Sequence, residues 1–144
     1  MLAVLSLSAC TGGNEEVYSQ FVHLPEHLWS HTVPCYFKPG IEGDDMSITL
    51  SLRHESEYEY ANANFTVDVL TRDSLVMRHP VTIRLVDDNG NWTSDGFGSL
   101  YQCQMPVADG VRLDSASVIL VWQSMPCDTL YHISEVGIDV TRNK

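Results

Sequence analysis

The stretch DDMSITLSLR, residues 44–53, alternates apolar and polar side chains at every second position. Its apolar members are Met46, Ile48, Leu50 and Leu52, and serine, threonine and arginine fill the positions between and after them. Successive side chains of a β-strand point to opposite faces of its sheet, so this pattern predicts a strand with one face in a core and the other in water.

The same alternation recurs along the rest of the chain. It is present in ANANFTVDVL (residues 61–70), in PVTIRLV (80–86) and in EVGIDV (135–140). The segment ASVILVWQ (116–123) is apolar at both sets of positions and predicts a central strand covered on both faces, with Trp122 in the core. No segment shows a convincing helical period, and LPEHLW (24–29) has room for one turn at most.

Turn signals separate these runs at residues 38–45, 87–91, 94–98 and 108–110. Asn89-Gly90 is the strongest short hairpin signal in the chain. About seven or eight short strands at this spacing are typical of an all-β, antiparallel β-sandwich of the jelly-roll or immunoglobulin-like kind. A closed barrel is the alternative, since patterning does not separate the two.

The composition limits both the size of the protein and its partners. With 144 residues, 44 % of them apolar, the chain suits a single domain with an ordinary core. Eight basic residues against nineteen acidic ones give a net charge of −11. This balance argues against binding nucleic acid, which needs lysine and arginine at the phosphates, and against docking on an anionic lipid surface by charge.

The first ten residues, MLAVLSLSAC, form an apolar run that ends in a cysteine. The run is shorter than the roughly 18–20 residues of a membrane-spanning helix. Leu7-Ser8-Ala9-Cys10 resembles the bacterial lipobox, which implies acylation of the Cys10 thiol, cleavage before Cys10 and acylation of the new amino terminus. Two or more acyl chains give stable attachment to a membrane.

These features divide the chain into three parts. Residues 1–9 are expected to be the remnant of a cleaved signal, residues 10–16 the lipidated cysteine and a flexible tether, and residues 17–142 the β-sandwich. No lysine or arginine precedes the apolar run, although signals carry a cationic start, so we expect the natural start to lie further upstream.

Two patterns suggest a metal site and then fail. His23, His27 and His31 would share one face of a helix, but Pro25 interrupts the segment, so a hydrated surface cluster is the better interpretation. The acidic run at 87–91 lacks the glycine and glutamate that a calcium loop places at fixed positions, so a hairpin turn is favoured. The sequence predicts no metal and no cofactor.

The sequence also predicts no enzymatic activity. It contains no GxSxG motif and no cysteine in a papain-like context, and the paired acids Glu57 and Glu59 fit a solvated strand face. With Cys10 lipidated, the thiols of Cys35, Cys103 and Cys127 allow at most one internal disulfide, and the sequence does not choose its members.

Three blocks of the chain resemble one known family. They are LRHESEYEYANANFTV (52–67), LVDDNGNWTSDGFGSLY (85–101) and QSMPCDTLYHISEVGIDV (123–140), and together they are similar to the gliding-motility lipoprotein GldH. The matching positions proposed as interaction or family-motif residues are Arg53, Tyr58, Tyr60, Asn62, Asp87, Gly90, Trp92, Gln123, Met125 and Asp128. His132 stands where the family commonly has a glycine.

The resemblance implies a non-enzymatic envelope lipoprotein of gliding motility or the associated type IX secretion machinery. Its implied partners are the membrane, through the lipid anchor, and other envelope proteins. Thr11 follows the anchor cysteine in place of the aspartate that retains lipoproteins in the inner membrane, which favours the outer membrane. The periplasmic face is preferred to the cell surface because no acidic pair directly follows Cys10.

The alternative function is a lipid-anchored carbohydrate-binding module. Small β-sandwiches hold glycans on exposed aromatic rings, and this function requires Trp29, Trp92, Tyr58 or Tyr60 to form a coplanar, exposed strip. Trp92, beside the hairpin turn, is expected to be the most exposed of the tryptophans.

Overall fold

The computed structural model describes residues 14–93 and 95–144, and Cys10 and the proposed signal lie outside this part. The described chain is built of strands with one short 3₁₀ turn, η2 (Pro25–His27). The strands are β1 (Glu15–His23), β2 (Leu28–Ser30), β3 (Cys35–Phe37), β4 (Gly43–Glu55), β5 (Asn62–Thr71), β6 (Ser74–Arg84), β7 (Asp95–Phe97), β8 (Leu100–Leu113), β9 (Ser117–Gln123), β10 (Thr129–Tyr131) and β11 (Ile133–Arg142).

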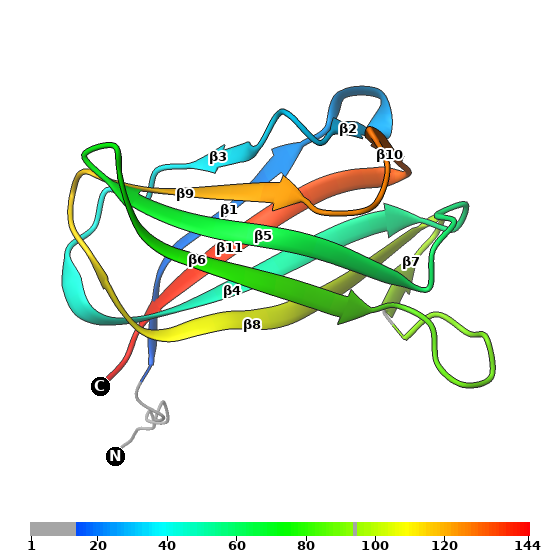
Figure 1. The fold of residues 1–144 in the computed structure, drawn as a ribbon. Helices are drawn as coiled ribbons and strands as arrows, with labels where there is room; N and C mark the ends of the chain where they lie inside the picture. The colour runs from blue at the N-terminus through cyan, green and yellow to red at the C-terminus, as the bar shows by residue number, and fades with distance from the viewer. Residues whose placement is uncertain (1–13, 94) are drawn as a thin grey trace, which may run out of the picture.

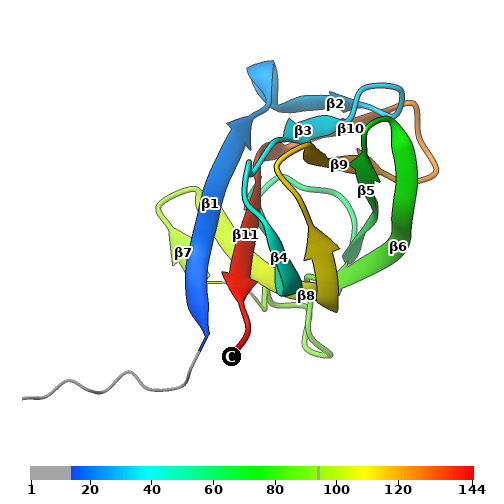
Figure 2. The ribbon, with the colours of Figure 1, turned by 90° about the vertical axis from the view of Figure 1, so that its left-hand side faces the viewer.

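Two antiparallel sheets face each other as the layers of a sandwich (Figures 1 and 2). One sheet has the strand order β1-β11-β4-β8-β7, the other has the order β3-β9-β5-β6, and β10 pairs with β2 beside them. The prediction of an antiparallel sandwich is confirmed, and the barrel alternative is not adopted. Strands β2, β3, β7 and β10 have three residues each, too few for a repeating pattern to mark them.

The alternating positions form the core as predicted. Met46, Ile48, Leu50 and Leu52 of β4 are at most 1 % exposed. The equivalent positions of the neighbouring and facing strands are also buried, namely Val136, Ile138 and Val140 of β11, Ala63, Phe65, Val67 and Val69 of β5, and Ile119 and Val121 of β9. Burying one such side chain contributes about 1.5–3 kcal/mol, so this set drives the pairing of the two layers.

Strand β9 differs from its prediction on its outer face. Ile119 and Val121 point into the core, whereas Val118, Leu120 and Trp122 are only half-buried. The Trp122 indole donates a 3.1 Å hydrogen bond from Nε1 to Asp68 Oδ2. An apolar run therefore misled the prediction, because an indole can cover a sheet face while its nitrogen satisfies a carboxylate.

Two bends also differ from their sequence signals. Residues 108–110 lie inside β8, where Gly110 has a φ of 66° and the register with β4 shifts, so they form a bulge and no turn. The tight connection between β5 and β6 instead uses Arg72 and Asp73, with φ of 51° and 67°. A turn of this kind usually takes glycine or asparagine, so Arg72 gave no signal.

The hairpin predicted at residues 87–91 is confirmed as a local turn. Gly90 adopts a φ of 83° and Val86 pairs with Trp92 in an isolated bridge. The flanking strands do not continue as a hairpin, because β6 belongs to the four-stranded sheet and β7 pairs with β8 in the other sheet.

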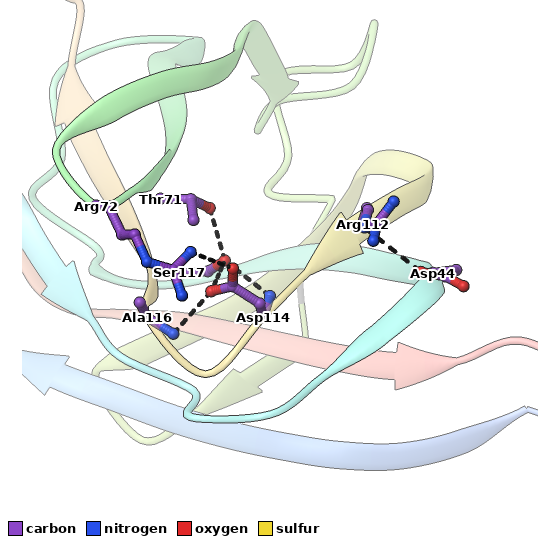
Figure 3. A network of polar contacts seen from close by, with 7 residues as sticks. All are labelled: Asp44, Thr71, Arg72, Arg112, Asp114, Ala116 and Ser117. Carbon is purple, nitrogen blue, oxygen red and sulfur yellow. Dashed lines mark hydrogen bonds and ion pairs between the residues drawn. The ribbon is translucent and has the colours of Figure 1, made fainter.

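The sandwich has two ends of different character. At the tether end, Glu15 of β1 lies opposite Arg142 of β11, so both ends of the described chain are side by side (Figure 1). Here Asp114 accepts hydrogen bonds from Arg72 Nη1 at 2.9 Å and from the Ala116 amide at 2.8 Å, which joins the β5–β6 turn to the β8–β9 turn (Figure 3).

The opposite end, which we call the distal end, consists of segments 24–34, 55–61, 85–93 and 124–132. These segments connect the last residues of β1, β4, β6 and β9 with the strands that follow. None of the helical structure in the described residues is long and apolar enough to cross a membrane.

Candidate functional site

Most of the predicted motif residues lie at the distal end. Tyr58 and Trp92 contact the same buried imidazole, that of His54, at ring-centroid distances of 5.6 and 4.7 Å. Tyr101 stacks on His54 at 5.5 Å. Burial lowers the pKa of His54, so this ring is neutral at ordinary pH and packs as an aromatic group.

Tyr58 and Asn62 shape the loop between β4 and β5. The Tyr58 side chain is 4 % exposed, and its hydroxyl donates a 2.9 Å hydrogen bond to the carbonyl oxygen of Asn62. Burial raises the pKa of this phenol above its ordinary value. Tyr60 packs edge-on against Tyr58 at 5.7 Å. These residues hold the loop in shape.

The four aromatic rings considered for glycan binding do not all lie on the surface. Trp29 is 1 % exposed, stacks on Phe65 and donates from Nε1 to the carbonyl oxygen of Val33. Tyr58 is buried as well, whereas Trp92 and Trp122 are both half-buried, so the greater exposure of Trp92 stays a prediction. Trp29 and Tyr58 are in the core, so neither of these two rings is available to an exposed glycan platform.

Gln123 and Met125 anchor the segment that follows β9. The buried Gln123 amide donates from Nε2 to the carbonyl oxygen of Cys127 at 3.2 Å, and its Oε1 accepts from the Met125 amide at 2.9 Å. Met125 is also buried, and its sulfur accepts from the Asn64 amide at 3.3 Å. This motif satisfies backbone groups where the strand ends.

Two other motif positions belong to turns or to solvent. Asp87 Oδ1 accepts hydrogen bonds from the amides of Asn89 and Asn91, at 2.9 and 3.0 Å, beside the left-handed Gly90. Asp128 has a fully exposed side chain, 3.6 Å from His31 Nε2. An exposed pair at this distance contributes little to stability.

Arg53 lies on the outer face of the five-stranded sheet. Its Nη1 contacts Glu135 Oε1 at 2.6 Å, its Nε donates to Gln102 at 2.8 Å, and its guanidinium lies 3.9 Å from the centre of the Phe21 ring. One side chain thus links β1, β11, β4 and β8. Glu135 neutralises the guanidinium, so Arg53 connects strands of this sheet to one another.

A polar cluster that the sequence did not reveal also lies at the distal end. Glu55 Oε1 is 2.8 Å from His27 Nδ1 and 3.1 Å from His132 Nδ1. Hydrogen bonds from these two imidazoles hold the pKa of Glu55 below its ordinary value. Ligand atoms of Glu55, Glu57 and His132 lie within 4.8 Å of one another. We call these four residues the Glu55 cluster.

The sequence held only an indirect signal of this cluster. His27, Glu55 and His132 are far apart in the chain, and His27 was grouped with His23 and His31. His132 has a φ of 70°, a backbone conformation that favours glycine. A histidine in this conformation is the feature that singles out the corner.

Three cysteines lie in the part of the chain that the structure describes. Cys35, Cys103 and Cys127 form no disulfide within the part of the chain that the structure describes. Burial raises the pKa of the Cys35 thiol to about 12, so it stays protonated and is a poor nucleophile.

Comparison with known families gives one match. Residues 16–140 match the family model described as GldH lipoprotein. This range covers the three motif blocks and every strand from β1 to β11 in part or in full. No curated protein matches the sequence.

Solved structures share the fold at low sequence identity. The Eiger TNF from S. frugiperda is 7 % identical, with a TM-score of 0.50, over 92 % of this chain and 94 % of that one. A carbohydrate-binding module of Cel9A from Ruminococcus flavefaciens FD-1 is 10 % identical, with a TM-score of 0.46, over 85 % and 97 %. The first likeness supports a jelly-roll-like sandwich and carries nothing beyond the fold.

Proposed function

The chain belongs to the GldH lipoprotein family, and from this we propose that it is a non-enzymatic accessory or assembly protein of gliding motility or type IX secretion. Members of this family are lipid-anchored envelope proteins. In our proposal the sandwich works by contacting other envelope proteins, and catalysis plays no part.

The anchor in this proposal is Cys10. A lipid at this position would connect to the sandwich at Glu15, which begins β1 at the tether end. The distal end would then face away from the bilayer. We further propose the outer membrane, because Thr11 follows the cysteine in place of aspartate, and its periplasmic face.

The observation that carries the proposal is the place of the family-motif residues. Those of the β4–β5 loop, the 85–93 loop and the segment after β9 gather at the distal end, opposite the termini (Figure 1). Most of them are engaged in packing or backbone hydrogen bonds, so their role is to fix the shape of this end. A surface of fixed shape suits binding to a partner protein.

Exposed apolar side chains at the distal end support a protein contact. Leu28, Val33 and Tyr131 are 37, 59 and 52 % exposed, and Tyr36 nearby is 56 % exposed. A groove beside them is lined largely by apolar atoms, including those of Trp29. Grouped exposed apolar residues with a polar rim are typical of interaction sites.

Site-specific photocrosslinking in cells tests which end is the contact surface. We would place a crosslinking amino acid at Tyr131, at the distal end, and at Val76 of β6, which is 55 % exposed near the tether end. We expect a discrete crosslinked envelope protein from position 131 and little from position 76. Equal capture at both positions, or capture from position 76 alone, would contradict the proposal.

Cell fractionation of Cys10→Ala tests the anchor. We expect the variant domain to leave the membrane fraction and to lose its cellular role while its unfolding midpoint stays unchanged, because the described fold begins beyond the tether. A variant that remains membrane-bound would refute lipidation at Cys10.

A further inference from the structure

Backbone hydrogen bonds bring three distant segments together at the Glu55 cluster. The Glu55 amide donates to the carbonyl oxygen of His132 at 2.9 Å, and the His132 amide donates to that of His27 at 3.0 Å. The end of β4, the turn between β10 and β11, and η2 are therefore joined before any side-chain contact is considered. The side chains start from fixed positions, as a preorganised binding site requires.

The backbone conformation of His132 costs free energy. Its φ of 70° and that of His27, 55°, lie in the left-handed region, which costs a residue other than glycine about 1 kcal/mol. In return, both imidazoles are directed at the same carboxylate oxygen of Glu55. Side chains held under backbone strain are found preferentially at functional sites.

The donor atoms and their spacing suit a divalent cation of the zinc class. Imidazole nitrogen and carboxylate oxygen bind zinc at roughly 2.0–2.2 Å, which puts neighbouring ligand atoms of a tetrahedral site about 3.3 Å apart. Glu55 Oε1 and His132 Nδ1 are 3.1 Å apart and share a hydrogen bond, so a bound ion takes the place of the proton between them. Glu57 completes a set of three ligands within 4.8 Å, and its carboxylate with that of Glu55 balances two positive charges.

Access and orientation are also provided. The side chains of His132 and Glu55 are 36 and 25 % exposed, so an ion can enter from solvent without unfolding the corner. His27 contacts Glu55 from the opposite segment at 2.8 Å. A partner of this kind fixes the orientation of a ligating carboxylate and strengthens binding.

We propose that His132, Glu55 and Glu57 bind one zinc-class divalent cation, with His27 orienting the Glu55 carboxylate. The ion closes the β10–β11 turn onto the end of β4 and stiffens the distal end. This site is independent of the family role, since it rests on the geometry of the cluster alone.

Zinc titration of the full chain, purified in detergent and stripped of metal, tests the proposal. Zn²⁺ is added in competition with a chromophoric indicator, and we expect one ion per chain. His132→Gly and Glu57→Gln should each lower the affinity by about 100-fold or more, and His27→Gln by about 10–100-fold. The matched control is His79→Gln, an exposed histidine on β6, which should bind zinc as the natural chain does.

Folding is monitored in the same samples by thermal unfolding. Zinc should raise the midpoint of the natural chain and of His79→Gln, and leave that of Glu57→Gln unchanged, since an ion that binds only the folded state stabilises it. Glu57 is exposed, so its substitution leaves the fold intact. Equal zinc affinity in the natural chain and Glu57→Gln, or weaker binding in His79→Gln, would overturn the proposal.

Failure of the zinc test and failure of the proposed family role are distinguishable. Binding is measured with the purified chain and the metal alone, whereas the role is measured by crosslinking in cells. If the chain binds zinc but captures no partner, the metal site stands and the family role is refuted. If it captures a partner but binds no zinc, only the metal site is refuted.

Discussion

The hydroxyl of Tyr58 donates a 2.9 Å hydrogen bond to the carbonyl oxygen of Asn62, four residues further along the chain. The bond spans the loop between β4 and β5, and the ring beneath it packs on the buried His54. A family-motif tyrosine thus ties a loop to the core from within. Its role in this structure is architectural, which explains why a tyrosine and not merely an aromatic residue stands there.

Tyr58→Phe should lower the free energy of unfolding by about 1–2 kcal/mol, because the ring is kept while the partly buried carbonyl oxygen of Asn62 loses its donor. Urea unfolding measures the change. Tyr131→Phe is the control, since Tyr131 is 52 % exposed, and we expect a change within about 0.5 kcal/mol there. Equal effects of the two substitutions would show that the Tyr58 hydrogen bond has no special weight.

Gly137→Ala should destabilise the protein by about 1–3 kcal/mol through overpacking. A β-carbon at Gly137 would lie 2.8–3.0 Å from three atoms of the Phe21 ring on the neighbouring strand. That ring is held in place under the Arg53 guanidinium, 3.9 Å from its centre, so it cannot easily yield. Chemical denaturation of the variant checks the loss.

A double-mutant cycle isolates the cause of this effect. In the background Phe21→Ala the same Gly137→Ala substitution should cost much less, because the clashing ring is gone. If the cost is the same in both backgrounds, the space between Phe21 and Gly137 is not what requires the glycine.

The long strands could be predicted because their signal is local. Each of Met46, Ile48, Leu50 and Leu52 is separated from the next by one polar residue, and one buried sheet face is sufficient to impose that spacing. The turn at Gly90 was equally local. These elements needed no knowledge of what packs against them.

The parts that were missed depend on contacts between distant residues. Trp122 lies on the outer face because Asp68, on the neighbouring strand, accepts its N–H. The Glu55 cluster joins His27 to His132 through Glu55, and backbone pairing alone decides that they meet. Arg72 and Asp73 turn the chain in a left-handed conformation that their residue types do not announce.

At position 132, glycine should be more stabilising than alanine by about 1 kcal/mol in metal-free protein. Both His132→Gly and His132→Ala remove the imidazole, so their difference isolates the backbone, whose φ is 70°. Thermal or urea unfolding with a chelator present measures it.

The control for that comparison is the same pair of substitutions at His79, inside strand β6. There the glycine variant should be less stable than the alanine variant by about 0.5–1 kcal/mol, because glycine loses more backbone freedom on folding and an extended strand does not need a positive φ. If the glycine variant is less stable than the alanine variant at both positions, the corner relaxes to an ordinary conformation once the histidine is removed.

Asp68→Asn should lower stability by about 2 kcal/mol near neutral pH, and the loss should shrink in acid. Asp68 is 2 % exposed, and its carboxylate accepts from Arg78 Nε and Nη2 at 2.8 and 2.9 Å and from Trp122. The Arg78 hydrogen bonds hold the pKa of Asp68 below its ordinary value of 3.8. The carboxylate therefore stabilises the fold fully above that value, and this stabilisation is lost as the pH falls below it.

Denaturation curves of the natural chain and Asp68→Asn, taken from about pH 7 to about pH 3, measure this convergence. Glu55, Asp109 and Asp114 also have lowered pKa values, so both proteins lose stability in acid, and only the difference between them reports on Asp68. Asp128→Asn, with a fully exposed carboxylate, should show no such difference at any pH. A constant gap between the natural chain and Asp68→Asn across this range would mean that packing of the side chain, and not its charge, links Trp122 to Arg78 on the outer face.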